Sequence, residues 1–250
     1  MLMASDPIDL TFAATGALLA GIVRGFSGFG AAMILVPILA ATHGPQLAVP
    51  VLLLVDMGPT MPLAWRARRH CAWREVLPLA TGFLVAMPFG VLVLLAADPV
   101  TLTRTMAILV IVVAAAMALG LRRTRPPGLP ATLAVGASAG LLSGSTGIGG
   151  PPVVLFWLSG QDAAPRTRAN VMVYFALSGV IGLVALTTAG LITPEVVAFS
   201  LALMVPYGGG LWLGAASFGR TDDATYRRLA LGLIAAVGLT ILVTSLGSGR

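Results

Sequence analysis

A glycine-rich pattern occurs twice in this chain, each time inside a long apolar stretch. The first copy reads Gly21-Ile-Val-Arg-Gly25-Phe-Ser-Gly28-Phe-Gly30, and the second, 119 residues later, reads Gly140-Leu-Leu-Ser-Gly144-Ser-Thr-Gly147-Ile-Gly149. Glycine at this density opposes a continuous helix, because each glycine costs about 1 kcal/mol relative to alanine in a helix interior. Interrupted apolar segments at matching places in two halves of a chain indicate the binding site of a transporter. The pattern therefore predicts two broken helices.

The composition indicates a membrane protein. Apolar residues make up 58% of the 250 residues and charged residues 10%. Stretches without charge cover residues 76–97, 129–160, 169–194, 196–219 and 229–249. Each is longer than the roughly 18 residues that span hydrocarbon. We therefore predict an all-α polytopic membrane protein, with no metal site and no cofactor, since the single cysteine, Cys71, offers neither a disulfide nor a metal cluster.

The two halves resemble each other beyond the glycines, as in Pro88-Phe-Gly90 and Pro206-Tyr-Gly208, 118 residues later. A near-constant offset predicts an N-terminal repeat (1–121), a cytoplasmic linker (122–129) and a C-terminal repeat (130–250). Each repeat is expected to contain one broken helix and three ordinary spans. In the first these are the broken helix 10–41 and the spans 47–65, 76–97 and 104–121; in the second, the broken helix 130–160 and the spans 168–189, 195–218 and 228–247.

The positive charge of +6 comes entirely from arginine, and its placement reports topology rather than a nucleic-acid partner. If each broken segment crosses the membrane once, eight arginines of the loops and termini lie on one side of the membrane and six on the other. If each is a hairpin that returns to its starting side, one side gathers 12 of the 15. Cytoplasmic loops carry the arginine excess, so the hairpin arrangement is favoured. It makes the repeats inverted, with arginine-rich loops in the cytoplasm and both termini outside the inner membrane. It is left open whether both arms of each hairpin cross the membrane fully, because full crossing would not change whether the number of crossings is odd or even.

The two glycine segments predict an anion-binding site. Glycine-rich turns expose backbone N–H groups, and helix N-termini add partial positive charge. Hairpin tips that enter from opposite faces would meet near the midplane. The alternative is that the Gly-x-x-x-Gly spacings only pack helices closely. The predicted substrate-binding residues are Arg24, Gly25, Ser27, Gly28, Gly30, Ser143, Gly144, Ser145, Thr146, Gly147, Gly149 and Gly150.

Several other polar residues fall at membrane depth, where charge requires a partner or a water-filled cavity. Arg24 either contacts the substrate anion, pairs with Asp56 or extends its guanidinium to the nearer membrane face. Asp56 is a candidate proton-coupling group or the counter-ion of Arg24. Asn170, Tyr174 and Tyr207 are weaker pathway-lining candidates. Asn170 is alternatively a cap or a partner for backbone groups, and Tyr207 a packing residue.

The repeated pattern Gly-x-x-x-Gly-x-x-Gly-x-Gly, with Pro37 and Pro151-Pro152 downstream, resembles that of the TauE/SafE sulfite-exporter family. The loop from Arg69 to Glu75 is also similar to that family's connection into its third span. This resemblance extends over nearly the whole chain. It implies an inner-membrane permease that carries sulfite, organosulfonates or other small anions, commonly outward. The first copy departs from the family pattern, because it continues as Gly30-Ala31-Ala32.

We therefore expect a transporter of a small anion, in which the two repeats rock around the site; Asp56 is the candidate for coupling transport to a proton or another ion. A passive anion channel would use the same donors. An intramembrane serine hydrolase is suggested by Gly25-Phe-Ser27-Gly28, but neither His43 nor His70 lies in a predicted span where it could act as the base. The expected partners are the small anion and the lipid bilayer, without nucleic acid; a homo-oligomer is left open.

Overall fold

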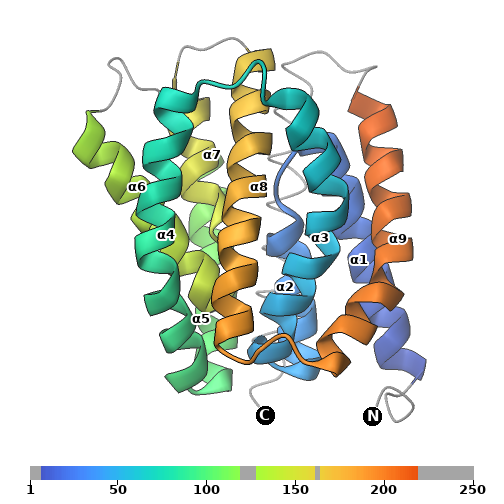
Figure 1. The fold of residues 1–250 in the computed structure, drawn as a ribbon. Helices are drawn as coiled ribbons and strands as arrows, with labels where there is room; N and C mark the ends of the chain where they lie inside the picture. The colour runs from blue at the N-terminus through green and yellow to red at the C-terminus, as the bar shows by residue number, and fades with distance from the viewer. Residues whose placement is uncertain (1–6, 119–127, 161–163, 219–250) are drawn as a thin grey trace.

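The computed structural model describes residues 7–118, 128–160 and 164–218 (Figure 1). These residues form nine α-helices and no strand. In chain order the helices are α1 (Pro7–Ser27), α2 (Ala31–His43), α3 (Pro45–Ala67), α4 (Trp73–Ala96), α5 (Pro99–Ala118), α6 (Leu129–Thr146), α7 (Gly150–Leu158), α8 (Ala164–Thr188) and α9 (Pro194–Phe218).

Among the described residues, four helices are long and apolar enough to cross a membrane: Pro45–Ala67, Trp73–Ala96, Pro165–Thr188 and Pro194–Ala216. Their lengths of 23 or 24 residues match the roughly 20 that a hydrocarbon core requires. The predicted all-α membrane fold is confirmed. The expected span 228–247 and most of the linker 122–129 lie outside the described residues.

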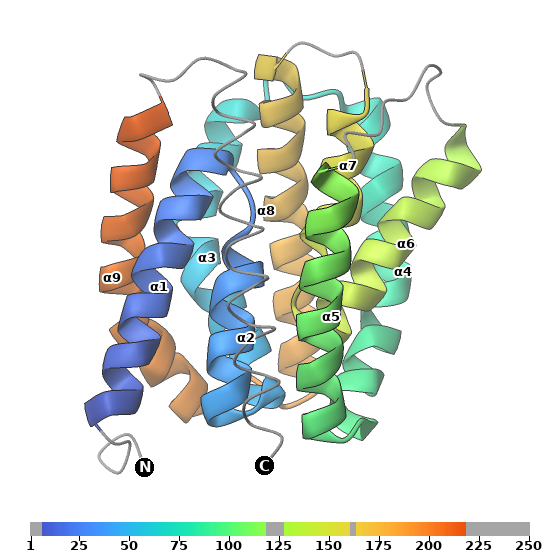
Figure 2. The ribbon, with the colours of Figure 1, turned by 180° about the vertical axis from the view of Figure 1, so that it is seen from behind.

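Both glycine segments interrupt a helix, as their composition predicts. α1 and α2 are separated at residues 28–30, and α6 and α7 at residues 147–149. In each case the chain reverses, so that α1 and α2 form one hairpin and α6 and α7 another (Figure 2). The α1–α2 hairpin opens at the end of the bundle where the described chain begins, and the α6–α7 hairpin opens at the opposite end. Both breaks lie between the two ends of the bundle.

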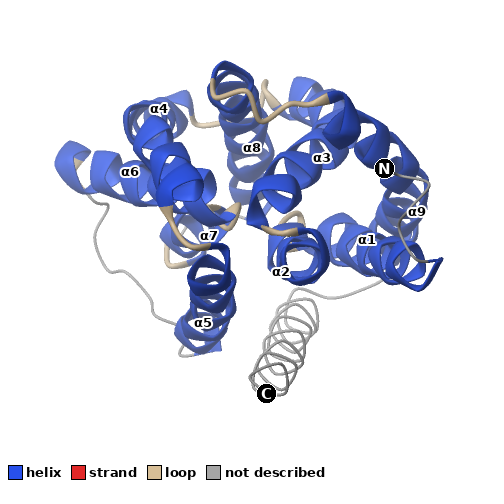
Figure 3. Ribbon diagram, turned by 90° about the horizontal axis from the view of Figure 1, so that it is seen from below, coloured by secondary structure: helices blue, strands red, loops and turns tan. Residues whose placement is uncertain are grey.

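Two helix pairs pack with almost no space between their backbones: α1 with α9, and α4 with α6. A Cβ atom placed at Gly21 would lie 2.2 Å from the Tyr207 carbonyl oxygen, and one at Gly140 would lie 2.4 Å from that of Phe83. Such approaches need glycine, and they are typical of small-residue interfaces between membrane helices. Each pair joins one helix from each half of the chain (Figure 3).

α5 begins at Pro99, five residues before the expected span, because Asp98 caps it. The Asp98 carboxylate accepts hydrogen bonds from the Thr101 backbone N–H (2.8 Å) and hydroxyl (3.0 Å). These bonds, the first above all, hold the pKa of Asp98 below its usual value. The carboxylate form is therefore the stabilising one. The contribution of this cap is complete above the ordinary pKa of about 4 and is lost as the pH falls further.

Arginines gather at one end of the bundle. The α3–α4 loop and the first turns of α6 and α8 lie at that end, opposite the α8–α9 turn (Figure 1). Arg66, Arg68, Arg69 and Arg74 are exposed around the α3–α4 loop. The Arg68 guanidinium lies 3.5 Å from the ring centroid of Trp65, an exposed aromatic of the kind found at membrane–water interfaces.

Candidate functional site

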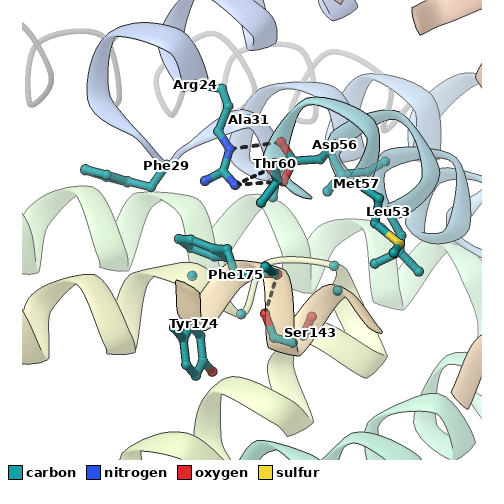
Figure 4. Close-up of a pocket in the computed structure, with 18 of the residues that line it drawn as sticks. Arg24, Phe29, Ala31, Leu53, Asp56, Met57, Thr60, Ser143, Tyr174 and Phe175 are labelled. Atoms are coloured by element: carbon teal, nitrogen blue, oxygen red, sulfur yellow. Dashed lines mark hydrogen bonds and ion pairs between the residues drawn. The ribbon is translucent and has the colours of Figure 1, made fainter. Parts of the chain in front are cut away.

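A cavity lies where the two helix breaks approach each other. Its volume is about 100 Å³, several times the roughly 10–15 Å³ that a single water molecule needs. Both breaks contribute to its wall, together with α3, α4 and α8 (Figure 4). The residues of the predicted site that line it are Arg24, Gly30, Asp56, Ser143, Gly147, Gly149, Gly150 and Tyr174.

The first break depends on left-handed backbone conformations. Gly28 has φ 78° and Gly30 has φ 93°, values that side-chain-bearing residues rarely adopt. The Gly28 N–H donates to the Arg24 carbonyl oxygen at 2.8 Å, which closes the last turn of α1. Gly30 caps α2, and the bond from the Met33 N–H to the Gly30 carbonyl (3.1 Å) starts that helix. Ala31 and Ala32, whose N–H groups come before this bond, line the cavity.

The second break is built differently. Gly147, with φ 71°, ends α6 by donating to the Ser143 carbonyl at 2.9 Å. α7 then begins at Gly150, and Pro151 and Pro152 follow at once. Because proline has no N–H, this helix N-terminus keeps fewer donors than that of α2. The two tips are thus unequal as anion sites, which the sequence pattern alone did not indicate.

Arg24 is buried, with 8% of its surface exposed, and it forms a two-point ion pair with Asp56 of α3. Its Nε lies 2.9 Å from Oδ1 and its Nη2 lies 2.9 Å from Oδ2. The Nη2 also donates to the Thr60 hydroxyl at 3.1 Å, and the Nη1 donates to the Gly28 carbonyl oxygen. The guanidinium carbon lies 4.5 Å from the centroid of the Phe175 ring (Figure 4).

Tyr207 completes this cluster from α9. Its side chain is fully buried, and its hydroxyl donates a short hydrogen bond to Asp56 Oδ1. A paired, hydrogen-bonded carboxylate and guanidinium are the form in which opposite charges tolerate burial. The cluster of Arg24, Asp56, Thr60 and Tyr207 therefore connects α1, α3 and α9 at the edge of the cavity.

Several predicted site residues lie away from the cavity wall. Gly25 and Gly144 serve the close helix pairs: a Cβ at these positions would lie 2.1 Å from the Leu211 carbonyl oxygen and 2.6 Å from that of Met87. Gly28 contacts Arg24 through its carbonyl group. The hydroxyls of Ser145 and Thr146 donate to carbonyl groups of their own helix, at 2.8 and 2.7 Å. The side chain of Ser27 lies outside the description.

Tyr174 is buried in an aromatic group beside the cavity. Its ring lies 5.8 Å from Trp157, 5.8 Å from Phe175 and 6.1 Å from Phe83, measured between centroids. In the part of the chain that the structure describes, its hydroxyl has no hydrogen-bond partner. Figure 4 shows the ring directed away from Arg24. Tyr174 thus contributes apolar surface on the side opposite the charged cluster.

Asn170 lies outside the cavity wall and holds the α3–α4 loop. It is fully buried; its Oδ1 accepts a hydrogen bond from the Ala72 N–H at 2.7 Å, and its Nδ2 donates to Glu75 at 3.4 Å. The same Glu75 oxygen accepts a bond from Trp157 Nε1 at 2.9 Å. This second polar cluster connects α4, α7 and α8.

We expect Asn170→Ala to lower the free energy of unfolding by about 1–3 kcal/mol, because it removes a fully buried amide and leaves the half-buried Ala72 N–H without its partner. Denaturant unfolding of the purified protein measures the change. Ser138→Ala is the matched control, because that hydroxyl is exposed and bonds only to its own helix. Equal stability of the two variants would contradict the structural role given to Asn170.

Sequence reasoning missed Thr60 and Phe175 as neighbours of Arg24. Thr60 lies one helical turn after Asp56, so the spacing alone would have suggested it. Nothing in the sequence identifies Phe175. Within the described ranges, no group of three or more histidine, cysteine, aspartate or glutamate side chains is placed to hold a metal.

Comparison with known proteins gives two matches. Residues 13–241 match the family model described as sulfite exporter TauE/SafE. A curated protein of Cupriavidus necator, named probable sulfite/organosulfonate exporter TauE, is 26% identical over 237 residues, which cover 89% of each chain. No solved structure matches the chain.

Proposed function

The chain belongs to the TauE/SafE sulfite exporter family, and from that premise we propose that it exports a small oxyanion, such as sulfite or an organosulfonate. The family and the curated relative are transporters, not enzymes. The observation that carries this proposal is a buried arginine at the wall of a cavity between two broken helices. Irregular backbone at membrane depth is tolerated where it lines such a cavity.

In the proposed site the anion lies in the cavity, in contact with Arg24, the first N–H groups of α2 and the Ser143 hydroxyl. The N-terminus of α2 should contribute more hydrogen bonds to the anion than that of α7, because α2 offers more backbone N–H donors. Apolar side chains of Phe175, Met57 and Met87 form much of the remaining wall. This wall accommodates the organic part of an organosulfonate while Arg24 binds its charged end.

Binding of a panel of anions to purified protein tests the site. Sulfite and short organosulfonates should bind saturably and compete with one another, whereas quaternary ammonium cations of the same size should not compete. Ser143→Ala should weaken sulfite binding about threefold to tenfold, because one neutral hydrogen bond is lost. Binding that is unaffected by Ser143→Ala and by anion competitors would refute the site.

We propose alternating access between two units that each mix the sequence halves. One unit contains α1, α2, α3 and α9; the other contains α4, α6, α7 and α8. The close pairs α1–α9 and α4–α6 support this division, as do the polar clusters of Arg24 and of Glu75, each of which stays within one unit. The two moving units are therefore not the two sequence repeats, which we propose to be inverted. Each unit instead combines helices from both repeats. Counterflow distinguishes this carrier from a passive channel, which would show none.

We further propose that the arginine-rich end faces the cytoplasm and that both termini lie outside. Cys71, the only cysteine, lies in the α3–α4 loop at that end. Burial first, and then Glu75, raises the pKa of its thiol, so labelling should speed up as the pH rises above 8. A membrane-impermeant maleimide should label Cys71 in inverted membrane vesicles and not in intact spheroplasts. The reverse pattern would overturn the orientation.

A further inference from the structure

In the structure, the guanidinium of Arg24 already holds an anion, the carboxylate of Asp56. Nε and Nη2 bind the two carboxylate oxygens, Nη2 also donates to Thr60, and Nη1 donates to the Gly28 carbonyl. Of the described residues that line the cavity, only Arg24 and Asp56 carry charge. A substrate oxyanion that needs two-point contact with Arg24 must therefore take the place of Asp56.

Tyr207 gives the displaced carboxylate a partner. It lies on α9, whose Gly210 and Gly214 pack against the backbone of α1. Its hydroxyl therefore keeps a fixed position relative to Arg24 and donates to the Oδ1 atom of Asp56. Asp56 can turn away from Arg24 by rotation about its side-chain bonds and keep this hydrogen bond. Tyr207 consequently holds Asp56 near the site in both arrangements.

We infer that Asp56 is a resident anion of the transport site, that a substrate oxyanion binds Arg24 by displacing it, and that Tyr207 is the positioning residue that retains it for its return. This inference rests on the proposed function. It makes anion binding an exchange: one ion pair opens as another forms, so that Arg24 is never left unpaired in the membrane.

The charge balance of this exchange involves a proton. With a monoanion and the Asp56 carboxylate both near Arg24, the cavity would carry one net negative charge. Transfer of a proton from water to the displaced Asp56 carboxylate restores neutrality, and the proton leaves when Asp56 returns to Arg24. The titratable or charged groups that contact Asp56 are Arg24 from α1 and Tyr207 from α9, while Tyr174 from α8 lines the opposite side of the cavity. One proton would thus accompany each monoanion.

The test compares single and double variants, with sulfite as the probe. Asp56→Asn should bind sulfite about tenfold more tightly than wild type, because the competing carboxylate is gone, and its sulfite flux should lose its dependence on a pH gradient. Tyr207→Phe should raise KM for sulfite about threefold to tenfold, because the displaced carboxylate loses its remaining partner, whereas the resting carboxylate still has Arg24. The double variant should behave like Asp56→Asn alone, since Tyr207 acts through Asp56. Ser200→Ala, a buried hydroxyl on α9 that bonds to the Val196 carbonyl, should leave KM unchanged.

Unchanged sulfite affinity in Asp56→Asn, or additive effects in the double variant, would overturn the exchange. If Asp56→Asn does not fold, because Arg24 has no partner, Asp56→Glu replaces it. That variant keeps a carboxylate and should retain pH-gradient dependence, and the rise in KM in Tyr207→Phe then decides the question. Failure of the proposed function is a separate result: wild-type protein would then show no saturable flux of any anion tested.

Discussion

Arg24→Gln should reduce saturable anion flux by about 100-fold, the largest functional effect expected in this chain. The variant removes the only positive charge among the described residues that line the cavity. Hydrogen bonds to charged groups contribute about 1.5–3 kcal/mol, and each 1.4 kcal/mol is tenfold in binding. Radiolabelled sulfite flux into proteoliposomes measures the loss. Arg24→Lys should recover only part of it, since lysine lacks the planar fork that binds two oxygens.

The control for this prediction concerns folding. Arg24→Gln alone leaves the half-buried carboxylate of Asp56 with Tyr207 and no counter-charge, at a cost of about 3 kcal/mol, the lower end of the range for buried pairs. The double variant Arg24→Gln/Asp56→Asn removes both charges, and we expect it to regain thermal stability without regaining flux. Recovery of flux in the double variant would show that Arg24 serves the fold and not the anion.

Gly25→Ala should give one of the largest losses of stability. The added methyl carbon would lie 2.1 Å from the Leu211 carbonyl oxygen and 2.8 Å from its carbonyl carbon, so α1 and α9 must separate. Backbone atoms cannot turn aside as a flexible side chain can. The cost is expected to be about 3 kcal/mol or more, at the upper end of what overpacking costs. Thermal unfolding in a fixed detergent measures the change.

Gly209→Ala is the matched control, with the same substitution on α9. Gly209 is exposed, and a Cβ there would meet no atom within 4 Å. Because alanine favours helices over glycine by about 1 kcal/mol, the control should be as stable as the wild type or more so. Equal loss of stability in both variants would contradict the packing account of the α1–α9 pair.

The helix breaks could be read from the sequence because their cause is local. Glycine density interrupts a helix wherever it occurs, and the structure has α1 and α6 end at Ser27 and Thr146. The possible pairing of Arg24 with Asp56 was also available, since a charge at membrane depth requires a partner. The proline pair after the second break is equally visible in the sequence, but the matching glycine patterns make the two tips look equivalent.

What could not be read from the sequence depends on distant segments. Gly25 belongs to the same motif as Gly30, and only the position of α9 shows that the first packs a helix and the second lines the cavity. The bond from Tyr207 to Asp56 joins residues 151 positions apart. Local patterns set where helices begin and end. The roles of these glycines and of Tyr207 depend instead on which helices of one half pack against helices of the other.

Counterflow of radiolabelled sulfite tests the central claim most directly. Proteoliposomes preloaded with unlabelled sulfite should transiently accumulate labelled sulfite above its equilibrium level, because a carrier exchanges anions across the membrane through one alternating site. Arg24→Gln/Asp56→Asn proteoliposomes, matched for folded protein, should show no accumulation. Flux without any overshoot in the wild type, or equal counterflow in the double variant, would contradict an alternating site built on Arg24.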